Sequence, residues 1–148
     1  MPNWCENEVT FSGDEEKVQK IKDFVKGKER DFCFEKIVPM PKEIKNTTKS
    51  SPSKTTPEQS KKLISKYGFD NWYDWCIENW DTKWNATDVE MEDEDDRVTY
   101  QFLTAWCPPE AVYYNLCRLF NIDKDEDIHC SWFYREEGME FSGYLNNP

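Results

Sequence analysis

The chain has 148 residues and a formal net charge of −11, and 16% of its residues are aromatic. This length suits one domain, and the aromatic content excludes a disordered chain, which is normally poor in Trp, Tyr and Phe. The excess of acid argues against binding to duplex DNA or to an anionic membrane surface, because both attract Lys and Arg. The sequence contains neither the roughly 20-residue apolar run of a membrane helix nor a signal-peptide pattern at its start. We therefore expect a protein of the cytoplasm.

The cysteine pattern gives no sign of a metal site or a catalytic thiol. No CxxC motif occurs, and His129 is the only imidazole, so a zinc site built from Cys and His is not expected. Within one strand His129 and Cys130 point to opposite faces and cannot form a nucleophile–base pair; a distant thiol such as Cys5 could still reach His129 across the sheet. No phosphate-binding loop, GxSxG or HExxH motif is present. We expect a non-enzymatic protein without metal or cofactor, whose reduced thiols are structural: Cys5, Cys33, Cys76, Cys107, Cys117 and Cys130.

The N-terminal region begins with a strand and a helix. Apolar and polar residues alternate over Glu6–Phe11, which predicts a strand with Glu8 on its polar face. Val18, Ile21 and Val25 then recur at the i, i+3, i+7 spacing of a helix face. These two elements are the start of a β-α-β pattern.

A second strand is predicted over Phe32–Ile37, and after it the composition changes. Lys42–Lys66 holds seven Lys and two Glu, a net charge of +5, so the rest of the chain carries −16. Pro, Ser and Thr are concentrated in residues 46–57. Low hydrophobicity and turn-forming residues predict a solvated, flexible loop there.

Residues 70–80 predict a short Trp-rich helix, which together with the loop forms an insertion over residues 42–84. Trp72, Cys76 and Trp80 lie at i, i+4 and i+8 on one face of this helix. One interpretation is that this face docks the helix on the main body. The other is that it binds a partner or stacks a ligand, because aromatic residues are enriched at interface hot spots.

The second half of the chain repeats the strand and helix order. Ala86–Met91 leads into five consecutive acids and then into a clear strand with Tyr100 and Phe102. A helix follows, whose apolar face is formed by Val112, Leu116 and Leu119. Two strands come after it, one with Ile128, Cys130, Trp132 and Tyr134 and the other with Met139 and Phe141. Two β-α-β halves are the signature of a ferredoxin-like fold. We predict one α+β domain over residues 1–148, with an antiparallel sheet, two helices on one face and the insertion between the halves.

Several strings in the sequence occur together in a known family. MPNWCEN at the start, IVPMP, YGFDNWYDWCIENWDTKWNA and FLTAWCPP resemble the YubB-type proteins of tailed phages and conjugative plasmids, which have a ferredoxin-like domain. The resemblance runs through nearly the whole chain, although the lysine-rich stretch over residues 49–62 is longer and less patterned than in that family. It implies the fold and a mobile-element origin, and it supplies no catalytic residues.

A mobile-element origin favours a protein that binds and inhibits a host defence complex, as anti-CRISPR proteins do, and CRISPR effectors are the expected targets. A dense acidic surface can imitate the phosphates of DNA and be drawn to a basic nucleic-acid channel. Two alternatives stay open: a nucleic-acid-binding module that uses the lysine-rich loop and exposed aromatic side chains, and an acidic accessory protein whose charge only confers solubility. RNA-recognition domains, which share this fold, carry a glycine and basic residues among the aromatic residues of their third strand. The corresponding strand here, Arg97–Phe102, has the aromatic residues but lacks the glycine and the basic neighbours. The expected partner-binding residues are the acids Asp88, Glu90, Glu92, Asp93, Glu94, Asp95 and Asp96, with Trp80 and Trp84 as aromatic anchors.

Overall fold

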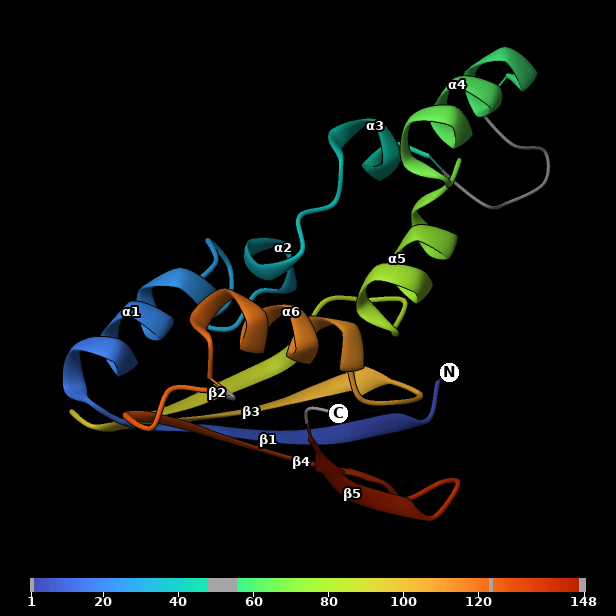
Figure 1. Ribbon diagram of the computed structural model, residues 1–148. Coiled ribbons are helices and arrows are strands. Elements are labelled where there is room, and N and C mark those ends of the chain that lie inside the picture. The colour runs from blue at the N-terminus through green and yellow to red at the C-terminus, as the bar shows by residue number, and fades with distance from the viewer. Residues whose placement is uncertain (1, 48–55, 123, 147–148) are drawn as a thin grey trace.

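The computed structural model describes residues 2–47, 56–122 and 124–146 (Figure 1). No helix in these three ranges is long and apolar enough to cross a membrane. The elements follow one another along the chain as β1 (Trp4–Gly13), α1 (Glu15–Val25), α2 (Phe34–Ile37), α3 (Lys42–Lys45), α4 (Pro57–Tyr67), α5 (Trp72–Trp80), β2 (Thr87–Asp93), β3 (Arg97–Ala105), α6 (Glu110–Phe120), β4 (Ile128–Glu136) and β5 (Phe141–Leu145).

The five strands form one antiparallel sheet in the order β2-β3-β1-β4-β5. Strand β1 lies in the middle, where Val9 is opposite Tyr100 of β3 on one side and Trp132 of β4 on the other. The order β1-α1-β2-β3-α6-β4 is that of a ferredoxin-like fold, to which β5 adds an edge strand. Helices α1, α2 and α6 cover one face of the sheet, and the other face is left open (Figure 1). The predicted fold class is confirmed.

The predicted strand over Phe32–Ile37 is wrong, because this segment packs on the sheet instead of joining it. Its end forms the short helix α2, and its backbone N–H groups bond outside any strand: Cys33 donates to the carbonyl of Val25 and Phe34 donates to the side chain of Asn85. Three consecutive residues from Phe32 onward are buried, whereas a strand would turn every second one away. The second strand of the ferredoxin-like order is therefore β2, which follows residues 42–84. The predicted place of the insertion, between the two halves, is also wrong, because residues 42–84 lie inside the first β-α-β half.

Aromatic packing explains why this segment is drawn over the sheet. The ring centroid of Phe32 lies 5.0 Å from those of Tyr100 and Phe102 and 5.9 Å from that of Trp132. Phe34 continues the cluster toward Trp80 at 5.7 Å. Each such ring buries a large apolar area, about 150–250 Å², so the segment gains more by covering the sheet than by extending it.

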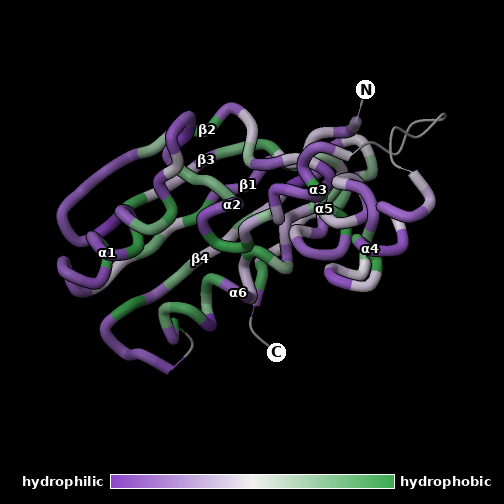
Figure 2. Tube along the Cα trace, turned by 90° about the horizontal axis from the view of Figure 1, so that it is seen from above, coloured by the Kyte–Doolittle hydropathy of each residue, from purple (hydrophilic) through white to green (hydrophobic). Residues whose placement is uncertain are grey.

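Helices α3, α4 and α5 gather at one end of the helical layer, as Figures 1 and 2 show from two directions. Helix α4 adds to the predicted elements; it starts with a capping box at Thr56 and ends at Gly68, whose φ of 83° is left-handed. The predicted loop over residues 46–57 falls mainly on residues 48–55, which lie outside the described residues, and Pro57 already belongs to α4.

The predicted Trp-rich helix is confirmed as α5. Asn71 caps its first turn by accepting a hydrogen bond from the backbone N–H of Asp74. Trp75, Cys76 and Trp80 are buried, and α5 contacts α6. Of the two interpretations of this helix face, the buried side chains favour docking on the body.

The connection after α5 is fixed by polar contacts to the β3–α6 corner. Asp81 has a left-handed φ of 63°, and its carboxylate accepts a hydrogen bond of 2.7 Å from the N–H of Ala111, in the first turn of α6. The hydroxyl of Thr82 donates to the carbonyl of Ala105 at 2.9 Å. Residues 81–82 therefore hold α5, the end of β3 and the start of α6 in one arrangement.

We expect Tyr100→Phe to stabilise the protein. The hydroxyl of Tyr100 is buried and has no hydrogen-bond partner among the described residues, and an unsatisfied buried polar group costs about 1–3 kcal/mol. Urea unfolding should show a gain of about 1 kcal/mol. Tyr113→Phe is the matched control, because its buried hydroxyl interacts with Cys117; an equal gain for both variants would contradict the explanation.

We expect Asp81→Ala to lower the free energy of unfolding by about 1–2 kcal/mol, the usual effect of losing a helix cap, and Asp81→Asn to preserve it. Asn retains an oxygen that accepts from Ala111 and tolerates a left-handed φ. Burial also raises the pKa of the Asp81 carboxyl, which means that the folded protein disfavours its charge. The neutral side chain of Asn should therefore not lower the free energy of unfolding. Denaturant unfolding of both variants at neutral pH makes the comparison, and similar losses in the two would rule out the capping role.

Candidate functional site

The fold leaves one side of the sheet free of helices (Figure 1). Along β1, Val9 and Phe11 point to the helical layer and are fully buried, while Glu6 and Glu8 lie on the other side and are exposed. We call this side the open face and define it by the outward positions of the strands: Trp4, Glu6, Glu8, Thr10, Ser12, Thr87, Glu90, Glu92, Arg97, Thr99, Gln101, Leu103, His129, Ser131, Phe133, Arg135, Ser142 and Tyr144.

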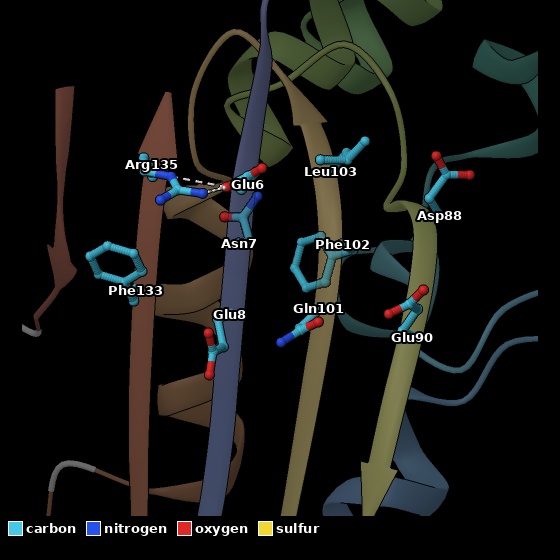
Figure 3. A pocket seen from close by; sticks show the side chains of 10 residues that line it. All are labelled: Glu6, Asn7, Glu8, Asp88, Glu90, Gln101, Phe102, Leu103, Phe133 and Arg135. Atoms are coloured by element: carbon cyan, nitrogen blue, oxygen red, sulfur yellow. Dashed lines mark hydrogen bonds and ion pairs between the residues drawn. The ribbon is translucent and has the colours of Figure 1, made fainter. Parts of the chain in front are cut away.

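The register of the sheet sets carboxylates across from one another on the open face. Glu8 of β1 is opposite Gln101 of β3, which is in turn opposite Glu90 of β2. Two strand spacings separate β1 from β2, about 10 Å. Glu8 and Glu90 therefore lie on either side of Gln101, as Figure 3 shows.

A β-bulge adds a third carboxylate to this group. The pairing of β2 shifts between Thr87 and Glu90, and Asp88 within the bulge has a left-handed φ of 51°. Bulges of this kind redirect side chains locally. Asp88 and Glu90 both line a shallow hollow of about 370 Å³ over β3 (Figure 3). The lining also includes Glu6, Glu8, Gln101, Leu103, Phe133 and Arg135.

The acids of the hollow are only partly neutralised. Arg135 pairs with Glu6 at 2.5 Å, and both side chains are about half exposed; an exposed pair of this kind contributes about 0–1 kcal/mol. Among the ion pairs between described residues, none involves Glu8, Asp88 or Glu90. These three carboxylates leave the hollow with negative charge that a cationic partner can meet.

The acidic residues predicted as one surface are divided by the β2–β3 hairpin. Glu90 and Glu92 lie on the open face and Asp88 lines its hollow, whereas Asp93 is on the opposite side, where it pairs with Lys22 of α1 at 2.5 Å. The three acids of the turn, Glu94, Asp95 and Asp96, are exposed at the end of the hairpin. The backbone of the turn is itself structured, since Glu94 donates to the carbonyl of Arg97.

Trp80 is wrong as an aromatic anchor, because it belongs to the core. Its side chain is only 3% exposed, and its indole N–H donates to the carbonyl of Val38 at 2.9 Å. Trp84 is 38% exposed and remains accessible, with its ring 5.9 Å from Trp4 and beneath the Lys83 ammonium at 4.1 Å.

Trp106 is an exposed aromatic residue that the sequence analysis missed. It follows β3 directly, is 49% exposed and has a φ of 76°. A bulky residue in the left-handed region costs about 1–3 kcal/mol and is retained only where the surroundings impose it. The one signal in the sequence is its place before Cys107-Pro108-Pro109, where the chain must turn into α6.

Cys5, Cys76 and His129 are not arranged for nucleophilic catalysis. Burial raises the pKa values of Cys5 and Cys76 to about 12, so their thiolates are not populated at neutral pH. His129 is exposed on the outward side of β4, opposite Ser12 of β1. Cys5 of β1 is opposite Glu136, which lies seven residues after His129 in β4. That separation is about 23 Å and excludes contact between Cys5 and His129. In the described parts of the chain, no three His, Cys, Asp or Glu side chains are grouped to hold a metal ion.

No family model, curated protein or solved structure matches this chain.

We expect the native thiols to react slowly with a disulfide reagent at pH 8. All six cysteines are free, and four of them are buried, namely Cys5, Cys33, Cys76 and Cys117. In the native protein these four should remain unlabelled over minutes, whereas six thiols per chain should react in denaturant. Mass spectrometry of the labelled peptides identifies the sites. Rapid native labelling of Cys5 or Cys76 would mean that an activated thiolate exists.

Proposed function

We propose that this chain is a non-enzymatic binding protein that docks its open face on a basic, nucleic-acid-binding surface of another protein. The observation that carries the proposal is the group of unpaired carboxylates, Glu8, Asp88 and Glu90, around one hollow on a sheet face without covering helices. An interface with complementary charge gains mainly in association rate and in selection of its partner. The partner is therefore expected to be strongly basic where it makes contact.

The spacing of the acids supports electrostatic steering more than close imitation of a DNA strand. Glu90 and Glu92 are two residues apart in β2, a separation of about 7 Å along a strand. Each strand of DNA carries one phosphate per about 3.4 Å of helix axis. The open face is thus less densely charged than DNA, and its attraction depends on the sum of several carboxylates.

The resemblance to mobile-element proteins supplies the proposed biological context. We infer that the partner is a host defence protein that handles nucleic acid, with CRISPR effectors as the leading class, and that binding in the bacterial cytoplasm inhibits it. An acidic protein that occupies the nucleic-acid channel of such an effector competes with its substrate. This context rests on the sequence strings alone.

Direct binding of nucleic acid is less well supported. RNA-recognition sheets stack bases on aromatic residues of their central strands, but the outward central positions here include Glu6, Glu8 and Gln101. Phosphates would meet repulsive carboxylates at this face. The described lysines of α4, including the exposed Lys61 and Lys62, are the remaining candidate contacts for nucleic acid.

We expect the double substitution Glu8→Gln with Glu90→Gln to slow association with the partner about three- to ten-fold at low ionic strength. Exposed charges contribute about 0–1 kcal/mol each, and the attraction is screened beyond about 8 Å at physiological salt. The partner is captured from host lysate with the tagged chain, purified, and measured by surface plasmon resonance over a salt series. The variant should also show a flatter salt dependence and an unchanged melting temperature.

The control for this test is Glu78→Gln with Glu126→Gln, which removes the same charge from exposed positions on α5 and before β4. It should retain the association rate of the unaltered chain. Equal rates for all three proteins at low salt would contradict the role of the open face. Recovery of nucleic acid in place of a protein would favour the alternative function.

A further inference from the structure

Three tryptophans lie at the end of the sheet where β1 begins and β3 stops, and two of them form a ring pair. Trp4 pairs with Ala105 across β1 and β3, and the backbone N–H of Trp106 donates to the carbonyl of Asn3 at 2.9 Å. Trp84 joins them from the segment before β2, with its ring 5.9 Å from that of Trp4. We call Trp4, Trp84 and Trp106 the tryptophan end of the sheet.

The tryptophan end is continuous with the acidic open face. The outward positions of β1 are, in order, Trp4, Glu6 and Glu8, so aromatic rings give way to carboxylates along one strand. The arrangement places aromatic surface and negative charge within reach of one cationic partner. Apolar contact and electrostatic attraction can then act in the same interface.

The backbone at Trp106 is strained although its side chain is half exposed. A φ of 76° is unfavourable for an indole side chain, and about half of the Trp106 surface, 49%, stays exposed. Glycine would satisfy the same turn without strain, and the hydrogen bond to Asn3 uses only the backbone. The backbone contact therefore does not require tryptophan, and the exposed half of its side chain is available for a contact made by the ring.

A cation of the chain itself already lies over one of these three rings. The ammonium group of Lys83 lies 4.1 Å from the ring centroid of Trp84, well inside the 6 Å range of a cation–π interaction. Trp is the aromatic residue that binds cations most strongly. Arginine is better suited than lysine to an exposed ring, because its guanidinium is planar, weakly hydrated and able to stack.

We propose that Trp106 is the anchor that takes an arginine guanidinium of the basic partner, with the Trp4–Trp84 pair at the same end of the sheet and the carboxylates of the open face holding neighbouring cations. This inference rests on the proposed function and deepens it, because it specifies arginine as the contacting residue. Trp106 replaces Trp80 among the aromatic anchors. The proposal assigns a reason to the strained turn: it holds an indole ring at the surface.

The test compares two synthetic probes, an octa-arginine and an octa-lysine peptide, by isothermal titration calorimetry against the full chain and the variant Trp106→Gly. The unaltered chain should bind octa-arginine more tightly than octa-lysine. Trp106→Gly should weaken octa-arginine binding about two- to five-fold, the size expected for one exposed cation–π contact, and should largely remove the preference. Its melting temperature should rise by a few degrees, because glycine relieves the positive φ.

Two controls separate this inference from the proposed function. Leu119→Ala removes another large exposed apolar side chain, from α6, and should leave both peptide affinities unchanged. The Glu8→Gln with Glu90→Gln variant should weaken both peptides and keep the arginine preference. If Trp106→Gly keeps the preference while the carboxylate variant loses affinity, the anchor is wrong and the acidic face stands. A lower melting temperature for Trp106→Gly would show that Trp106 serves packing, which also overturns the anchor.

Discussion

The packing of Phe32 over the middle of the sheet is the contact on which the rest of the structure depends. Its ring stacks on Phe102 with an interplanar angle of 18° and also meets Tyr100 and Trp132, which belong to β3 and β4. Because this segment fills the space over the central strands, it cannot also be a strand. The place in the sheet beside β3 is then left for β2, whose bulge and carboxylates create the acidic hollow.

The one-sided arrangement of helices also divides the chemistry of the molecule. The fully buried aromatic side chains lie on the helical side of the sheet, among them Phe11, Phe34 and Trp132. The open face carries carboxylates, amides and hydroxyls, and on it the half-buried Phe133 and the exposed Tyr144 form a ring pair at 5.2 Å. An antiparallel sheet tolerates such a solvated face. The face is therefore available for binding without any change in the core.

Periodicity was sufficient to predict the strand Glu6–Phe11, the face of α1 and the ferredoxin-like fold class, because most of the elements are amphipathic on their own. It failed at Phe32–Ile37, where apolar content resembles a strand but tertiary packing decides the conformation. The acidic hollow was partly predictable: Asp88 and Glu90 belong to a visibly acidic stretch. The contribution of Glu8 depends on which strands are neighbours, and the exposure of Trp106 depends on a backbone angle. Neither can be read from local sequence.

The central claim is that the open face, and not the helical side or the basic α4, is the binding surface. Backbone amide chemical-shift mapping of the ¹⁵N-labelled chain during titration with octa-arginine tests it most directly. The account predicts that the largest shifts cluster on β1, β2 and β3 around Glu8, Glu90 and Gln101, and at the turn that holds Trp106. Shifts spread evenly over exposed acids such as Glu78 and Glu126, or concentrated on the helical layer, would contradict it.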